Sequence, residues 1–273
     1  MSRATTPTPF NEALRSSRTE AGGDAGATAR LSRQGFVHLA VSTLPQPDET
    51  TCGPTCLHAI YRYWGRTVPL SEVIERTHRF PHGGTLAVFL GCDALRQGYR
   101  ARIYTCNLLV FDPSWFVRPR VNLAERLQRQ RELKADPRLQ QATSGYLEFL
   151  ALGGRIRFAT VPQQLIRSIL HCKLPILTGL SATYLNRSPR EYGDDALVDD
   201  LRGLPAGHFV VIAGWDPARR RVLVIDPYQP NPYGRSHSYW MGIDRVVGAV
   251  LLGIVTHDAN LLVVYPAARG WRA

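Results

Sequence analysis

The stretch Gln46-Pro-Asp-Glu-Thr-Thr-Cys52-Gly-Pro-Thr-Cys-Leu57 carries the signals of a helix that begins near a cysteine. Thr50 or Thr51 is placed to cap the helix, Pro54 fits its first turn, and Gly65 is placed to end it. The apolar residues between these signals recur at helical spacing: Leu57, Ile60, Tyr61 and Trp64. The stretch therefore predicts an amphipathic helix with Cys52 in its first turn.

A cysteine in this position has the chemistry of a nucleophile. The unpaired backbone N–H groups and the positive end of the helix dipole favour its thiolate, which is the reactive form. Gly53 leaves room beside the sulfur where a substrate backbone would pass. The backbone N–H of Cys52 and the side chain of Gln46, six residues earlier, are candidate donors to an oxyanion.

Two later segments supply a base and a carboxylate. His208 begins an apolar run that ends at the turn signal Asp216-Pro-Ala-Arg219, and Asp226 ends the next apolar run. For a hairpin centred near Pro217, His208 would lie directly opposite Asp226, on the same face of the sheet. Asp226 would then orient the imidazole of His208 toward Cys52.

The cysteines also allow simpler interpretations than a nucleophile. Cys56, one turn beyond Cys52, is expected to be a small buried apolar residue. Cys52, Cys56 and His58 also suggest a zinc site, but no second cluster would complete the tetrahedral ligand set. We therefore expect no metal and no cofactor.

Composition favours one main soluble domain. The 273 residues are 44% hydrophobic, which is enough to bury a sizeable core. The formal net charge is +11, but Lys134 and Lys173 are the only lysines, and the arginines lack the interleaved aromatics of a nucleic-acid surface. The five cysteines form no paired pattern and no signal peptide precedes them, so we expect a cytoplasmic protein without nucleic acid. The oligomeric state is left open.

The order of predicted elements is helices first and strands later, which indicates an α+β fold. Residues 1–35 lack periodic apolar residues and are predicted to be a disordered tail before a domain over 36–273. The expected helices cover about 70–77, 85–97 and 161–172, with two polar helices over 122–150 that are broken at Asp136-Pro137. The expected strands cover 99–105, 174–179, 208–213, 221–225, 246–255 and 261–265, and the last two are too short to span a membrane.

A polar loop over 181–207 leads directly to His208. Its carboxylates are a candidate lid or specificity element that would favour a basic peptide, or else an ordinary solvated loop: Glu191, Asp194, Asp195, Asp199 and Asp200.

The segments Gln46 with Cys52-Gly-Pro-Thr-Cys-Leu57, His208-Phe-Val-Val211 and Asp226-Pro227 resemble the bacteriocin-processing peptidase family of the papain-like clan, whose members cleave leader peptides after a double glycine. The resemblance covers about residues 40–106 and 160–265, with a helical insertion at about 107–160. It implies a papain-like α+β fold with N-terminal helices packed on a C-terminal antiparallel sheet. It also implies Cys52 as nucleophile, His208 as base, Asp226 as orienter and Gln46 in the oxyanion hole.

These observations predict a free-standing cysteine peptidase that acts on a peptide or protein through a thioester on Cys52. Two alternatives stay open at this point. One is a peptide-binding module that keeps the fold without turnover, and the other is an acyl transferase that passes the thioester to an amine.

Overall fold

The computed structural model describes residues 35–80, 83–117, 121–193, 196–256 and 258–271. The predicted tail over 1–35 lies outside the described residues except for Gly35. The described chain forms a compact unit, and its helices are α2 (Cys52–Tyr63), α3 (Leu70–Arg76), α4 (Ala87–Arg96), α5 (Ser114–Val117), α6 (Leu123–Leu133), α7 (Pro137–Ala151), α8 (Gln163–His171), α9 (Ala182–Asn186), α10 (Ile243–Leu252) and the 3₁₀ turn η2 (Gly253–Thr256).

The strands are β1 (Val37–His38), β2 (Tyr99–Thr105), β3 (Arg155–Phe158), β4 (Ile176–Ser181), β5 (Glu191–Tyr192), β6 (Leu197–Val198), β7 (Gly207–Asp216), β8 (Arg221–Ile225), β9 (Ser238–Gly242) and β10 (Asn260–Pro266). The main sheet has the order β3-β2-β10-β4-β7-β8-β9, and β1 also pairs with β7. Every pairing in it is antiparallel except β2 with β3, while β5 and β6 form a separate hairpin. The predicted α+β class is confirmed.

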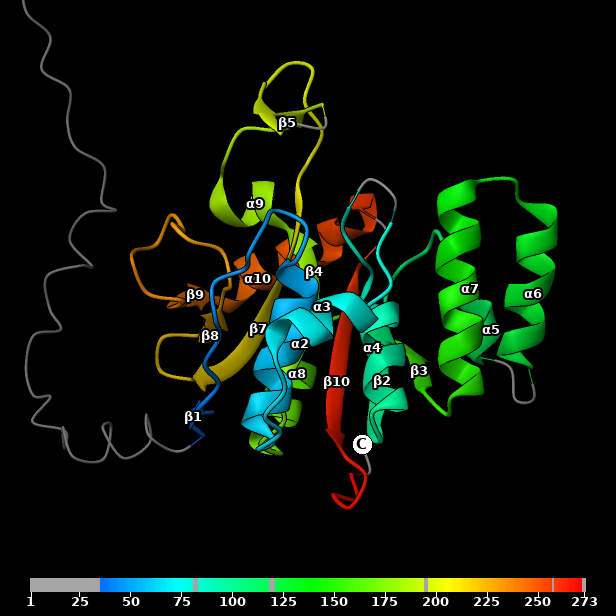
Figure 1. The fold of residues 1–273 in the computed structure, drawn as a ribbon, viewed down its shortest axis with the longest axis horizontal. Coiled ribbons are helices and arrows are strands. Elements are labelled where there is room, and N and C mark those ends of the chain that lie inside the picture. Colours follow the sequence, from blue (N-terminus) through cyan, green and yellow to red (C-terminus); the bar gives the residue numbers. More distant parts are fainter. Residues whose placement is uncertain (1–34, 81–82, 118–120, 194–195, 257, 272–273) are drawn as a thin grey trace, which may run out of the picture. The chain divides into compact units, whose positions relative to one another are not determined.

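Helices cover both faces of the central strands. In Figure 1, α2, α3 and α4 lie in front of the sheet, and α8 and α10 lie behind it. Accordingly, every residue of β4 is buried, and so is every residue of β7 from Phe209 onward. Three residues of the apolar stripe predicted for α2 are buried: Leu57, Ile60 and Tyr61 have no surface exposed to solvent.

The predicted strand over 246–255 is wrong. Residues 243–252 form the helix α10, followed by η2. The buried side chains Ile243, Val246, Ala249 and Val250 recur at intervals of three or four, which is helical spacing. A short apolar run fits a buried strand and a buried helix equally well by composition, and packing behind β4 decides the outcome here.

The segment predicted as a helical insertion contains the paired helices α6 and α7, which stand beside α4 in Figure 1. Asp136 caps α7 by accepting bonds from the N–H groups of Arg138 and Leu139, and Pro137 occupies the first turn. The predicted break at Asp136-Pro137 is therefore the start of the second helix. Among the described residues, no helix is long and apolar enough to cross a membrane.

Candidate active site

Cys52 is the first residue of α2, and its side chain is 8% exposed. Thr51 holds the predicted N-cap position, but its hydroxyl does not cap the helix and instead bonds to the backbone of Asp48. The first turn of α2 contains no acidic residue that would offset the positive end of the helix dipole. The sulfur therefore lies where the helix dipole favours a negative charge.

Gly53 is required by packing inside the protein rather than by passage of a substrate. A Cβ at this position would lie 2.6 Å from Cγ2 of Thr85 and 3.2 Å from Cδ2 of Phe209. The start of α2 is thus pressed against the start of β7. Cys56 strengthens this contact, because its buried thiol donates to the carbonyl of Phe209 at 3.3 Å. Burial raises the pKa of the Cys56 thiol well above its usual value, so Cys56 is an inert structural residue.

His208 stands at the start of β7, one residue before Phe209, and lies near both predicted partners. Its Nε2 donates to Oδ1 of Asp226 at 2.8 Å, since the carboxylate only accepts. The Cys52 side chain interacts electrostatically with this ring, and both residues line the same cleft. The structure thus brings His208 and Asp226 into contact and places Cys52 on the wall of the same cleft as His208.

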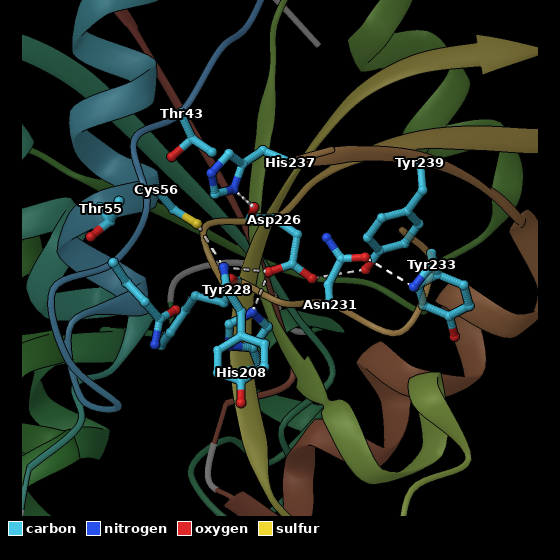
Figure 2. Close-up of polar contacts among 12 residues, drawn as sticks. Thr43, Thr55, Cys56, His208, Asp226, Tyr228, Asn231, Tyr233, His237 and Tyr239 are labelled. Atoms are coloured by element: carbon cyan, nitrogen blue, oxygen red, sulfur yellow. Dashed lines mark hydrogen bonds and ion pairs between the residues drawn. The ribbon is translucent and has the colours of Figure 1, made fainter. Parts of the chain in front are cut away.

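Asp226 is held by three donors (Figure 2). Its Oδ1 accepts from His208 and from the backbone N–H of Tyr228 at 2.9 Å, and its Oδ2 accepts from the hydroxyl of Tyr239 at 2.9 Å. Its backbone is fixed as well, because its N–H and carbonyl both bond to His237. A carboxylate with this many donors has one orientation, and it passes that orientation to the imidazole.

The predicted hairpin register is wrong by two residues, although the predicted neighbours are right. Asp216 pairs with Arg221, so the turn is centred between Ala218 and Arg219 and not near Pro217. Val211 pairs with Ile225, and continuing this register sets His208 opposite Tyr228, whose ring centroid is 6.2 Å from that of His208. A shift of two residues keeps the same face, so His208 and Asp226 meet as diagonal neighbours.

A β-bulge at Ala213 makes this meeting possible. Ile212 pairs with Val224 and Gly214 pairs with Leu223, so Ala213 is an extra residue on β7. Without this extra residue, the register set by the turn would offset His208 from the position opposite Asp226 by an odd number of residues. Their side chains would then point to opposite faces of the sheet.

The charges of the pair stabilise each other. Burial lowers the pKa of His208, but the Asp226 carboxylate, its hydrogen bond and the Cys52 side chain outweigh this and raise the pKa to about 10. Burial likewise opposes ionisation of Asp226, and the neighbouring His208 with the three donors holds the pKa of Asp226 below its usual value. The site therefore favours an imidazolium beside a carboxylate at neutral pH.

Gln46 lies in the loop before α2, next to the Asp226 segment. Its backbone N–H donates to the carbonyl of Pro227 at 3.0 Å, and its side-chain Nε2 donates to the carbonyl of Asp48 at 2.9 Å. The buried Oε1 has no partner among the described residues. The structure therefore brings Gln46 to the edge of the site, with its amide donor engaged within its own loop.

Cys52 and His208 both line an open cleft of about 450 Å³. Thr85 and Leu86 before α4, Gly179 and Leu180 of β4, and Leu204 and Pro205 before β7 form further parts of its wall. Asp258 also lines the cleft, where burial raises its pKa to about 7 although the Ala87 N–H and Asn260 bond to it. Cys52 thus lies on the wall of a cavity that is open to solvent.

The loop over 181–207 lines the cleft through Leu204, Pro205 and Gly207, and not through any of the predicted carboxylates that the structure describes. Burial is the main cause of the raised pKa of Glu191, and the nearby Glu49 raises it further. His208 acts on Glu191 in the opposite direction, and both His208 and Glu49 line the cleft. Asp199 instead bonds to the backbone N–H groups of Leu201 and Arg202 and pairs with the Arg202 side chain. Asp200 is exposed, and Asp194 and Asp195 lie outside the described residues.

Cys52, Cys56 and His58 do not share a metal site. His58 is buried, and its Nε2 bonds to the carbonyl of Val68 at 3.0 Å, while Cys56 is engaged with Phe209. Within the described parts of the chain, no group of three or more His, Cys, Asp or Glu side chains is arranged to hold a metal ion.

Sequence reasoning missed Tyr228 and Tyr239. Tyr239 belongs to β9, a short strand with alternating burial that was not predicted. Its alternation, with Tyr239 and Met241 buried between more exposed neighbours, was the available signal. Tyr228 supplies a backbone N–H two residues after Asp226, a turn contact that aspartates commonly make.

No protein-family model matches the chain, and no curated protein matches it. Several solved structures do resemble it. The peptidase domain of Streptococcus ComA, described as a bifunctional ABC transporter of a quorum-sensing pathway, has 13% identity and a TM-score of 0.38, covering 83% of this chain and 99% of that chain. A double-glycine-motif protease from an AMS/PCAT transporter, solved in complex with the leader peptide, has 14% identity and a TM-score of 0.40, covering 85% and 95%. Xylellain, a cysteine protease from Xylella fastidiosa, has 15% identity and a TM-score of 0.43, covering 85% and 86%.

Proposed function

We propose that the protein is a cysteine peptidase that cleaves a peptide bond through a thioester on Cys52. The observation that supports this most directly is the hydrogen bond of His208 to Asp226 on the wall of an open cleft that Cys52 also lines. A histidine between a helix-terminal thiol and a fixed carboxylate has the arrangement of a nucleophile, base and orienter.

In the proposed reaction, the Cys52 thiolate attacks the carbonyl carbon of the scissile bond. The resulting oxyanion accepts hydrogen bonds from the Cys52 N–H and from Nε2 of Gln46, which would exchange its bond to Asp48 for the substrate. The imidazolium of His208 gives its proton to the departing nitrogen, the carbon–nitrogen bond breaks, and a thioester remains. His208 then takes a proton from water, whose oxygen attacks the thioester and releases an acid and the thiolate.

Incubation with a diverse peptide pool tests the proposal. Wild-type protein is expected to generate new peptide termini, whereas Cys52→Ala is expected to generate none, and intact-mass spectrometry is expected to detect an acyl adduct on wild-type protein alone. Tight peptide binding without adduct or cleavage would instead favour a silent binding module. Products joined to an added amine in preference to water would identify a transferase.

Gln46→Ala is expected to lower kcat by about 10²- to 10³-fold, because one of two oxyanion donors is lost. KM is expected to change little, since the donor acts mainly on the transition state. Steady-state kinetics on a peptide from the pool measures both constants. Gln163→Ala is the matched control, because Gln163 bonds to Asp244 and Arg220, away from the cleft. Equal kcat values in the two variants would exclude Gln46 from the oxyanion site.

A further inference from the structure

The catalytic cleft continues into a second and larger groove. This groove has a volume of about 1290 Å³, and it shares Phe80 and Gly83 with the cleft that contains Cys52 and His208. One wall is the end of α3 with the residues up to Phe80, and the other is the α6–α7 hairpin. We call this cavity the hairpin groove. The two cavities meet at Phe80.

The α7 wall is long enough to contact several residues of an extended chain. Gln140, Gln141, Ser144, Gly145 and Glu148 line the groove, and Arg138 at the start of the same helix lines the catalytic cleft. From Arg138 to Glu148 is ten residues, or about 15 Å of helix. An extended polypeptide advances about 3.3 Å per residue, so about four or five residues of it match this length.

Unpaired arginines line the path from one cavity to the other. Arg138 lies over the ring of Phe80, 5.8 Å from its centroid, and Arg79 adjoins Phe80 in the groove. Arg131 donates to Ser144 and to Gln128, both neutral. Among the described residues, none of these three arginines has a carboxylate within ion-pair distance, although Arg79 acts on Asp48 at longer range.

The other arginines of the groove are paired with carboxylates. Arg76 pairs with Glu72 and Asp93, and Arg96 pairs with Glu148, so these arginines are already neutralised. Glu75 and Glu132 also line the groove, and among the described residues neither has an arginine within ion-pair distance. At the junction itself, Arg79 next to Phe80 and Arg138 over its ring supply positive charge without a carboxylate partner, whereas the remaining wall carries charges of both signs with polar amides.

We propose that the hairpin groove binds the substrate polypeptide beside the scissile bond, and that it selects acidic side chains through Arg138, Arg79 and Arg131. About four or five substrate residues would lie extended along α7, with a carboxylate near Phe80. This inference rests on the proposed peptidase function, because it assigns the groove to the same substrate. It gives the α6–α7 hairpin the role of a specificity element.

Peptide binding to the Cys52→Ala variant tests the groove without turnover. The probes are fluorescein-labelled twelve-residue peptides of Gly, Ala and Gln that carry two Glu, two Gln or two Lys at the same positions, with six-residue versions of each. Fluorescence anisotropy is expected to give at least about tenfold tighter binding for the Glu twelve-mer than for the Lys twelve-mer, and weaker binding for the six-mer.

Single variants locate the effect. In the Cys52→Ala background, Arg138→Gln and Arg131→Gln are each expected to reduce the preference for Glu over Lys by several-fold. Arg129→Gln is the matched control, because Arg129 is an exposed arginine of the same hairpin that lines neither cavity. A photoreactive residue in the Glu twelve-mer is expected to crosslink to the 138–148 segment. Circular dichroism melting checks that each variant folds.

An unchanged Glu preference in Arg138→Gln and Arg131→Gln, or crosslinks confined to other surfaces, would overturn the proposal. Its failure is distinguishable from failure of the peptidase assignment. Cleavage of the peptide pool by wild-type protein without charge-selective binding would reject the groove alone. Charge-selective binding without any cleavage or adduct would reject the enzyme and retain the groove.

Discussion

Cys52→Ala is expected to lower the rate of peptide cleavage by about 10⁶-fold, because the covalent route is lost. The thiolate forms the covalent bond to the substrate, and the described cleft offers His208 no second thiol, since Cys56 is buried and bonded to Phe209. The fold is expected to survive, because alanine at the first position of α2 removes one sulfur from a site that opens to the cleft. Single-turnover kinetics and thermal melting measure the two effects.

Cys56→Ala is the matched control, since it removes a thiol one turn along the same helix. It is expected to lower stability, because a buried thiol and its bond to Phe209 are lost, while most of the activity remains. Alkylation with iodoacetamide, followed by peptide mapping, is expected to modify Cys52 and the exposed Cys172, but not Cys56. Turnover that persists in Cys52→Ala, or that disappears only in Cys56→Ala, would reject Cys52 as the nucleophile.

Asp226→Asn is expected to lower kcat by about 10⁴-fold with the fold intact. An amide presents either an N–H or a carbonyl to His208, so the ring loses the negative charge and the fixed tautomer that Asp226 imposes. Because Asp226 raises the pKa of His208, the variant is expected to have a lower His208 pKa. The alkaline limb of the activity profile would therefore move to lower pH. Kinetics across pH and NMR titration of ¹³C-labelled histidine in the Cys52→Ala background measure these changes.

Two further variants test whether the changes in kcat and in the His208 pKa are specific to the Asp226 carboxylate. Tyr239→Phe removes one of three donors to the carboxylate and is expected to lower kcat by about tenfold, with a smaller change in the His208 titration. Asp216→Asn is the control, because Asp216 is a buried aspartate at the opposite end of β7 that pairs with Arg219 and Arg221. It is expected to affect stability but not the pH profile. An unshifted His208 titration in Asp226→Asn would contradict the coupling.

The same pair sets a pH window for its contribution to stability. The pKa of His208 is raised in the folded protein, so its contribution is complete below the unfolded value of 6.5 and is lost as the pH rises toward 10. The pKa of Asp226 is lowered from 3.8, so its contribution is present above that pH and is lost as the pH falls below it. Between these limits the pair stabilises the site.

The sequence predicted the elements that follow strong periodic patterns. The limits of β2 and β8 match the predicted strands, and the helix predicted to begin near Cys52 begins at that residue. The residues at the front of α2 were informative because helix starts depend on local signals such as Pro54 and on a following apolar stripe. The helix α10 was mistaken for a strand because its apolar run is nearly continuous.

Other parts of the site depend on pairing that no local pattern specifies. The proximity of His208 and Asp226 was predicted from an incorrect turn centre and an unbroken ladder, and the bulge at Ala213 supplied the compensating residue. Tyr239 was missed because β9 is short and reaches Asp226 only through its pairing with β8. The role of Arg138 at the cleft depends on how α7 packs beside α4, which the polar sequence of the hairpin does not indicate.

The bulge at Ala213 also determines where the chain tolerates insertions and deletions. The turn from Pro217 to Arg220 lies beyond the bulge, so residues added there lengthen an exposed connection and leave the ladder near His208 unaltered. Removal of one residue between Phe209 and Ala213 would instead rotate His208 away from its carboxylate. The two ends of a single strand thus differ sharply in their freedom to change length during evolution or engineering.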